Sequence, residues 1–195
     1  MKTGQKTVIT ELQIKDFLED HYAEPINEIA HVGEGWWSQA FTFTRSGTEY
    51  VVRFGAHNED FLKDKIASDF AKADLPVPKV LEVGAAFGEY FAISERAYGT
   101  MFDHLGASEM KRAIPSILQT FDAIRRIDTS NGSGYGMWDL ALKAPHESWQ
   151  SALVSISEDD AAKRGGGWSK KLANNPKVND FYQQIKSEFT ELASR

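Results

Sequence analysis

Cysteine is absent from the 195 residues, which excludes disulfide bonds, thiolate catalysis and cysteine-rich zinc sites. No apolar run approaches the roughly 20 residues that a membrane-spanning helix needs, and the start of the chain lacks the apolar centre of a signal peptide. Positive charge is also scarce, since 22 lysines and arginines face 28 aspartates and glutamates, for a formal net charge of −6. We therefore expect a cytoplasmic protein that binds neither membranes nor nucleic acids.

The sequence does contain enough apolar material for a core. Hydrophobic residues make up 42% of the chain and aromatic residues 12%, which is typical of a globular protein rather than a disordered one. A chain of this length suits one large domain or two small lobes.

The expected elements follow the order helix, three strands, helix, two strands, and then a mostly helical remainder. Thr10 and Gln13 have the spacing of a capping box, which predicts a first helix at residues 10–22. Phe41 and Phe43 alternate with threonines, as in a half-buried strand. The other strands are expected at 26–32, 50–54, 79–83 and 90–94, and the second helix at 59–73.

Gly33 and Gly35 lie at the first tight bend of this sheet, where a missing side chain lets the backbone approach a ligand. Arg53 is the one cation on the third strand, among the β-forming residues of YVVRF. A glycine-turned hairpin followed by a strand with one embedded cation is how protein-kinase-like folds hold ATP. The kinase pattern has a third glycine where this chain has Ser38, and a lysine where it has Arg53. An ordinary turn is therefore the competing interpretation.

A kinase-like small lobe also has a helix whose carboxylate braces the cation. On the expected helix 59–73 the candidate brace is Asp64, near the middle, with Asp60 and Asp69 as rivals. The alternative is that these carboxylates only lie on a solvent-exposed face of the helix. The apolar stripe of this helix is expected at Leu62, Ile66 and Phe70.

The remainder of the chain is mostly helical. One apolar stripe runs from Ile114 to Ile127, and another covers the last helix from Val178 to Leu192. The last stripe has no later partner in the chain, so it either packs back on the helix at 114–127 or lacks a continuation. Because a wide apolar face favours self-association, we expect a dimer or oligomer, or an unstable C-terminal part.

Seven segments along the chain match one known family, in the same order and with similar spacing. They are GEG with SQAF (33–41), YVVRF (50–54), FLKDK (61–65), LPVPKVLEVG (75–84), ISERAYG (93–99), FDAIRRID (121–128) and SGYG (133–136). In these segments the chain resembles the aminoglycoside phosphotransferase family. The resemblance implies an α+β, protein-kinase-like fold. Residues 1–97 would form a nucleotide-binding N-lobe with an antiparallel five-stranded sheet and a bracing helix, and residues 98–195 a partial helical C-lobe.

The resemblance also implies transfer of phosphate from a nucleoside triphosphate to an antibiotic hydroxyl. Carried over by position, Gly33, Gly35 and Ser38 would line the phosphates. Arg53 would hold the α and β phosphates, and Asp64 would brace Arg53.

Residues 94–97 would be the hinge, whose backbone groups at Glu95 and Ala97 would meet the edge of adenine. The competing interpretation is an ordinary strand end. For such a family the expected cofactor is ATP or GTP with Mg²⁺, and the expected partners are the nucleotide and a cationic aminoglycoside.

The catalytic residues of the family follow a motif of the form H-x-D-x-x-x-x-N, which supplies the base for the acceptor hydroxyl and a magnesium ligand. None of the five histidines begins this pattern, so no catalytic or metal-binding residue is assigned, and we expect the chain alone to be inactive. The acidic run 158–160 could attract a cationic aminoglycoside or a metal, or be a solvated loop or helix end. The alternative function is a kinase-like binding or interaction module without turnover.

Overall fold

The structure is a computed structural model, and it describes residues 8–35, 37–155, 158–160 and 166–193. The chain divides into two compact units, Met1–Ile127 and Asp128–Arg195. The predicted lobe boundary at 94–97 falls inside the first unit, and the division into two lobes there stays a prediction.

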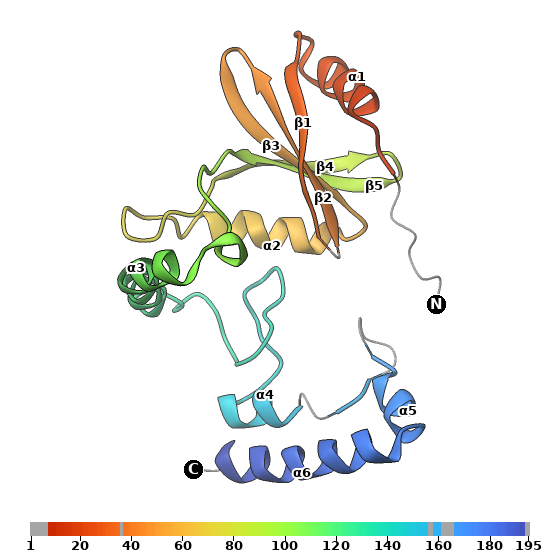
Figure 1. Ribbon diagram of the computed structural model, residues 1–195, viewed down its shortest axis with the longest axis vertical. Helices are drawn as coiled ribbons and strands as arrows, with labels where there is room; N and C mark the ends of the chain where they lie inside the picture. The colour runs from red at the N-terminus through yellow and green to blue at the C-terminus, as the bar shows by residue number, and fades with distance from the viewer. Residues whose placement is uncertain (1–7, 36, 156–157, 161–165, 194–195) are drawn as a thin grey trace. The chain divides into compact units, whose positions relative to one another are not determined.

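The first unit is built on a five-stranded antiparallel sheet with strand order β1-β2-β3-β5-β4 (Figure 1). The sheet confirms the predicted α+β, kinase-like arrangement of three strands, a helix and two strands. The strands are β1 (Asn27–Glu34), β2 (Ser38–Arg45), β3 (Thr48–Gly55), β4 (Val80–Ala86) and β5 (Glu89–Glu95). The helices of this unit are α1 (Glu11–Tyr22), α2 (Asn58–Ser68), the 3₁₀ turn η1 (Phe102–His104) and α3 (Ala107–Arg125).

Helix α1 begins at the predicted capping box. The Gln13 amide donates to Thr10 Oγ1 at 3.3 Å, and the Thr10 amide donates to Gln13 Oε1 at 3.0 Å. These two bonds satisfy amide groups that the first turn of a helix leaves without partners. Ile14 and Leu18, one turn apart, are fully buried against the sheet.

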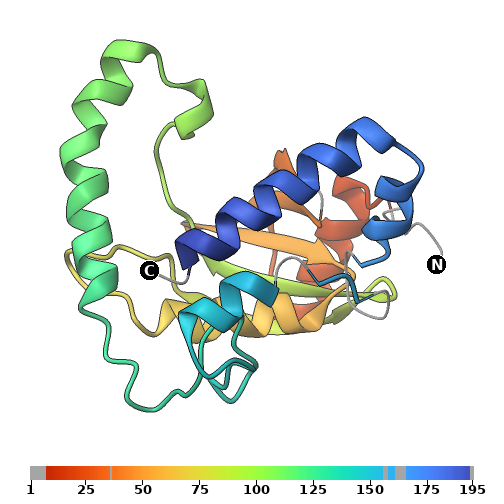
Figure 2. The same ribbon diagram turned by 90° about the horizontal axis from the view of Figure 1, so that it is seen from below.

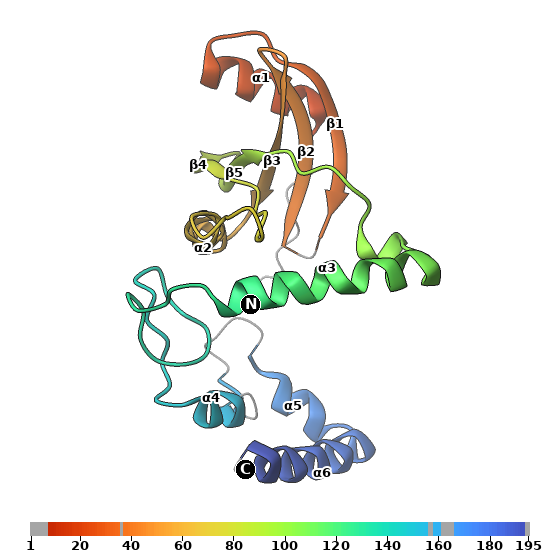
Figure 3. The ribbon, with the colours of Figure 1, turned by 90° about the vertical axis from the view of Figure 1, so that its left-hand side faces the viewer.

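The two faces of the sheet are covered by different helices. In Figure 3, α1 and α2 lie on opposite sides of the part of the sheet formed by β4 and β5. The larger core lies on the α1 face and contains Ile9, Ile14, Leu18, Ile26, Phe41, Phe43, Val52, Phe54, Phe91 and Ile93. A smaller cluster on the α2 face contains Phe61, Val80 and Ala92. Because side chains alternate along a strand, Val52 and Phe54 enter the larger core while Arg53 points to the α2 face.

Helix α2 is shorter than predicted and buries a different side. It ends at Ser68 instead of Ala73, and its buried residues are Phe61 and Ser68, whereas the predicted stripe residues are only half-buried. After Ser68 the chain closes into tighter turns, in which the Phe70 amide donates to the Ala67 carbonyl at 3.1 Å. A helix cannot continue through such i to i+3 turns for long.

The outer strands of the sheet are irregular, whereas the inner pairings run without a shift. In the β1–β2 pair the register shifts between Asn27 and Ala30 and again between His31 and Gly33. In the β4–β5 pair it shifts between Val80 and Glu82. The β2–β3 and β3–β5 ladders show no such shift, so the residues on β3 have fixed neighbours on both sides.

The second unit contains α4 (Trp149–Ser155), α5 (Trp168–Ala173) and α6 (Pro176–Ala193). Both shorter helices contact α6 (Figure 2), and the rings of Trp168 and Tyr182 meet at 5.1 Å between centroids. The apolar stripe predicted on the last helix lies on α6, where Val178, Phe181, Ile185 and Leu192 are exposed. Within the described ranges, no helix combines the length and the apolar character that crossing a bilayer requires.

Candidate functional site

A single row of residues crosses four strands at the centre of the α2 face. Gly33 on β1 pairs with Ala40 on β2, Ala40 with Arg53 on β3, and Arg53 with Ala92 on β5. Paired residues share a face of the sheet, so Arg53 stands between two alanines, with a glycine one strand further out. Small neighbours leave space beside the guanidinium, and Gly33 lies two strands, or about 10 Å, from Arg53.

The guanidinium of Arg53 is held by Asp64 from α2. Its Nη2 donates to Asp64 Oδ2 at 2.7 Å, and the guanidinium lies 5.4 Å from the centre of the Phe61 ring. This is the pairing that the sequence predicts, while the rival Asp69 pairs with Lys79 instead. The two paired side chains are 30% and 46% exposed, so they reach solvent and an incoming ligand. A guanidinium has five N–H donors, and this ion pair uses one of them.

The glycine bend lies at the β1 end of the same row. The Gly35 amide donates to the Ser38 carbonyl oxygen at 2.9 Å, which closes the bend between β1 and β2. Neither Gly33 nor Gly35 has a positive φ, and a Cβ atom would meet nothing within 4 Å at Gly33 and only the Ser38 oxygen, at 4.0 Å, at Gly35. Within the described residues, neither the backbone angles nor steric crowding requires glycine at these two positions. A ligand that lies close to the backbone does require such open space.

Ser38 opens β2 and pairs with Gly55, the last residue of β3. Since it lies two residues before Ala40, it faces the same side of the sheet as Arg53. The register thus brings Gly33, Ser38 and Arg53 to one surface, with Gly35 in the bend beside them.

The predicted hinge follows β5. Glu95 ends this strand, and its amide donates to the Lys79 carbonyl at 3.0 Å, so this amide is already used within the sheet. Ala97 is exposed, and the next residue, Tyr98, donates its hydroxyl to Glu49 Oε2 at 2.6 Å. That hydrogen bond raises the pKa of Tyr98, and it anchors the segment to the start of β3.

Comparison with known proteins finds chains of similar sequence and fold among the aminoglycoside phosphotransferases. The crystal structure of aminoglycoside phosphotransferase APH(4)-Ia is similar to this chain with a TM-score of 0.71 and 28% sequence identity, over 76% of this chain and 51% of that one. A thermostable mutant of that protein, in a ternary complex with AMP-PNP and hygromycin B, has a TM-score of 0.69 and 28% identity over 74% and 50%. The hygromycin-B 4-O-kinase of Escherichia coli is 29% identical over 157 residues, which are 79% of this chain and 46% of the relative. The chain is thus similar in sequence and in fold to the aminoglycoside phosphotransferases.

No protein-family model matches the chain. It spans about half the length of the phosphotransferases that it resembles. The roles of Gly33, Gly35, Ser38, Arg53, Asp64, Glu95 and Ala97 in nucleotide binding are therefore carried over by position and stay predictions.

The acidic run at 158–160 has a structural role in the second unit. Asp159 accepts hydrogen bonds from the amides of Gly167 at 2.6 Å and Ser169 at 2.8 Å, and also from the Ser169 hydroxyl. These bonds, that of the Ser169 hydroxyl first, lower the pKa of Asp159 and cap the start of α5. Of the two interpretations of the run, helix capping is what the structure shows for Asp159.

The described residues do not form a metal site. No group of three or more histidine, aspartate or glutamate side chains among them is arranged to hold an ion. No described residue is therefore assigned as a ligand of the Mg²⁺ that the resemblance implies, and no step is assigned to a metal.

A surface cavity of about 460 Å³ lies elsewhere in the first unit, between the loop before β4 and α3. The ion pair between Asp74 and Arg126, 2.7 Å long, crosses it, and Ser116, Gln119 and Asp122 also line it. It includes none of the predicted nucleotide residues. The cavity is open and shaped by an exposed ion pair, so we place the candidate site at the row around Arg53, where several sequence features converge.

Three further residues near the site had no signal in the sequence. Ser68, Lys79 and Glu49 make their contacts with residues 12, 16 and 49 positions away, respectively. None of them belongs to a motif of fixed spacing, so only the folded arrangement reveals them.

Proposed function

We propose that this chain is the nucleotide-binding part of an aminoglycoside phosphotransferase, which transfers the terminal phosphoryl group of ATP, or GTP, to a hydroxyl of a hygromycin-type antibiotic. The observation that carries the proposal is the row of small residues with Arg53 at its centre, oriented by Asp64 beside a glycine bend. The relative that holds AMP-PNP and hygromycin B supports both substrates.

In this proposal the residues of the chain bind and orient the triphosphate. Arg53 lies against the α and β phosphates, and its remaining N–H donors neutralise their charge. Asp64 keeps the guanidinium in place when the site is empty. Because Gly33 and Gly35 carry no side chain, the triphosphate can lie close to the backbone of the bend.

Transfer itself breaks the bond between the γ phosphorus and the oxygen that bridges it to the β phosphate. A new bond forms between that phosphorus and the acceptor oxygen, and the hydroxyl proton passes to a base. The base motif H-x-D-x-x-x-x-N does not occur in these 195 residues. The chain alone should therefore bind nucleotide without turning it over.

Adenine would then meet the hinge through two backbone groups. The Glu95 amide is bonded to Lys79, which leaves the Glu95 carbonyl as an acceptor for the amino group of adenine. The Ala97 amide supplies the donor for the neighbouring ring nitrogen. This pattern favours adenine over guanine, because guanine presents a carbonyl oxygen where adenine has its amino group.

Titration of the chain with ATP and Mg²⁺ tests the proposal, by calorimetry and by thermal shift. Gly35→Ala should leave the melting temperature unchanged, since a Cβ there meets open space, but should lower ATP affinity about tenfold. Gly106→Ala, at the start of α3 and away from the row, is the matched control and should keep full affinity. Absence of heat and of thermal shift at millimolar nucleotide would overturn the proposal.

A second candidate is a kinase-like module that binds a partner without nucleotide. It is favoured by the two departures from the kinase pattern, Ser38 for glycine and Arg53 for lysine. The same titration separates the two, because this module would give no signal. Transfer of labelled phosphate to hygromycin B by this chain alone, abolished by a substitution within it, would contradict our account of the chemistry.

A further inference from the structure

The buried hydroxyl of Ser68 joins the end of α2 to the start of β4 through hydrogen bonds. Ser68 Oγ donates to the Lys65 carbonyl at 2.8 Å and accepts from the Val80 amide at 3.2 Å. Ser68 is 1% exposed and Val80 4%. β4 is an outer strand, so the Val80 amide has this hydroxyl in place of a strand partner.

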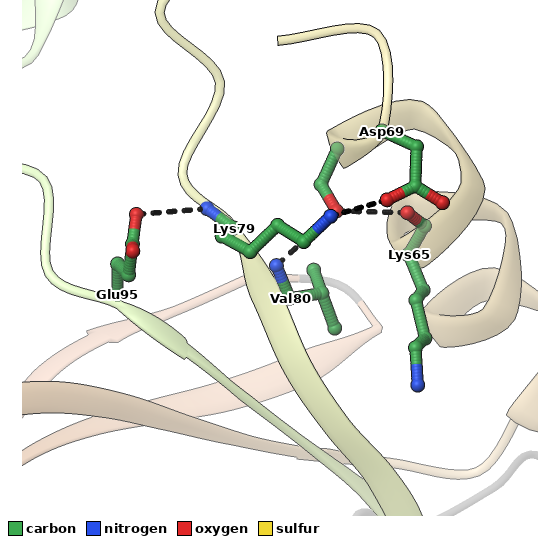
Figure 4. A network of polar contacts seen from close by, with 6 residues as sticks. Lys65, Asp69, Lys79, Val80 and Glu95 are labelled. Atoms are coloured by element: carbon green, nitrogen blue, oxygen red, sulfur yellow. Dashed lines mark hydrogen bonds and ion pairs between the residues drawn. The ribbon is translucent and has the colours of Figure 1, made fainter.

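A second pair of contacts lies directly before β4, at Lys79. Lys79 and Glu95 exchange two bonds, since the Lys79 amide donates to Glu95 Oε2 at 3.3 Å and the Glu95 amide donates to the Lys79 carbonyl at 3.0 Å. Figure 4 shows Lys79 between Glu95, which its backbone contacts, and Asp69, the residue after α2, which its ammonium group contacts. The end of α2 is thus connected to the predicted hinge.

These contacts bear on Asp64 through the geometry of the helix. Asp64 precedes Ser68 by four residues, so both lie on the same side of α2, one turn apart. A helix held at Ser68 cannot slide along the sheet, and this keeps the Asp64 carboxylate at its 2.7 Å distance from Arg53.

We propose that Ser68 and Lys79 are positioning residues, which hold Asp64 against Arg53 and fix α2 relative to the hinge. This inference rests on the proposed function. It goes beyond it by assigning a role to two residues that touch no nucleotide. The phosphate half of the site should depend on them more strongly than the adenine half.

Two partial ligands separate the halves: tripolyphosphate for Arg53 and adenosine for the hinge. We compare the wild type with Ser68→Ala and with Lys79→Met, whose side chain is 47% exposed and therefore leaves the core intact. Lys63→Met is the matched control, because it breaks an ion pair of 2.7 Å with Glu59 within the same helix, and that pair includes no residue of β4. A readout without ligand is the NMR signal of the Arg53 guanidinium, whose rotation is restricted while Asp64 holds it.

We expect both test variants to bind tripolyphosphate about fivefold to tenfold more weakly, with adenosine affinity within about twofold of the wild type. Their Arg53 signals should average as rotation becomes free, and Lys63→Met should match the wild type throughout. If Ser68→Ala fails to fold, Lys79→Met carries the test alone. Unchanged tripolyphosphate affinity and unchanged Arg53 signals in Lys79→Met would overturn the positioning role while leaving the proposed function intact. If the wild type binds neither ligand, the proposed function fails, and unaltered Arg53 signals in the variants would then refute the positioning role separately.

Discussion

Arg53→Met removes the guanidinium but keeps an unbranched side chain that can still pack on Phe61. The Arg53–Asp64 pair is 2.7 Å long, with side chains 30% and 46% exposed. Solvent screens a pair of this exposure, so it contributes about 0.2–1 kcal/mol to stability. The contact of the guanidinium with the Phe61 ring, at 5.4 Å, adds about 0.5–1 kcal/mol. The free energy of unfolding should therefore fall by about 2 kcal/mol at most.

The expected loss of nucleotide affinity is larger. A hydrogen bond to a charged group contributes about 1.5–3 kcal/mol. Loss of one such bond between Arg53 and a phosphate lowers ATP affinity about tenfold to a hundredfold. Arg53→Met should thus weaken ATP binding more than it lowers the free energy of unfolding. This is expected of a residue that contributes more to ligand binding than to stability.

The assay pairs guanidinium chloride unfolding with calorimetric titration of ATP and Mg²⁺ at fixed ionic strength. Arg53→Lys keeps the charge and should retain part of the affinity, while Asp64→Asn should lose less than Arg53→Met. Arg125→Met, on α3 and paired with Asp122 at 3.4 Å, is the control for removal of one positive charge. ATP affinity equal to the wild type in Arg53→Met would refute the assignment of this side chain to the phosphates.

Three other outcomes follow from the structure. Gly84→Ala should destabilise the fold by about 1–3 kcal/mol in denaturant unfolding, because the new Cβ would lie 2.6 Å from the buried ring of Phe91. Burial, and then the nearby Glu82 carboxylate, raise the pKa of Tyr22 from 10.0 to about 12. The fold is favoured while this phenol is protonated, so stability should decline as the pH rises across that range. NMR titration should show the raised pKa, and Glu82→Gln should bring it part of the way back. Phe181 on α6 is 63% exposed, and if this apolar face drives self-association, Phe181→Ser should shift the chain towards monomer in sedimentation.

The local parts of the fold could be predicted from the sequence. The capping box at Thr10 and Gln13 fixed the start of α1, because both partners lie within one turn. The alternation around Phe41 and Phe43 placed β2 and the face that it buries. The pairing of Arg53 with Asp64 was also predicted, from the kinase-like order of the elements and the place of Asp64 near the middle of its helix.

Other features depend on contacts that no local pattern encodes. The period of α2 indicated a helix but not which side would be buried, and that side is set by Phe61 packing near Val80 and Ala92. Its end is set by Ser68 and the turns that follow it. The contact between His21 Nε2 and Glu82 Oε1, 2.6 Å long, joins α1 to β4 across 61 positions of sequence, and a motif of fixed spacing cannot reveal it.

The shifted registers of β1 and β4 have a consequence for how this sheet meets other molecules. An edge strand with evenly spaced donors and acceptors can recruit a strand from another chain and start an aggregate. Here both borders are interrupted, on β1 at two places and on β4 near Val80, whose amide is already taken by Ser68. A foreign strand would find mismatched partners at either edge of the five-stranded sheet, and this disfavours the addition of a further strand.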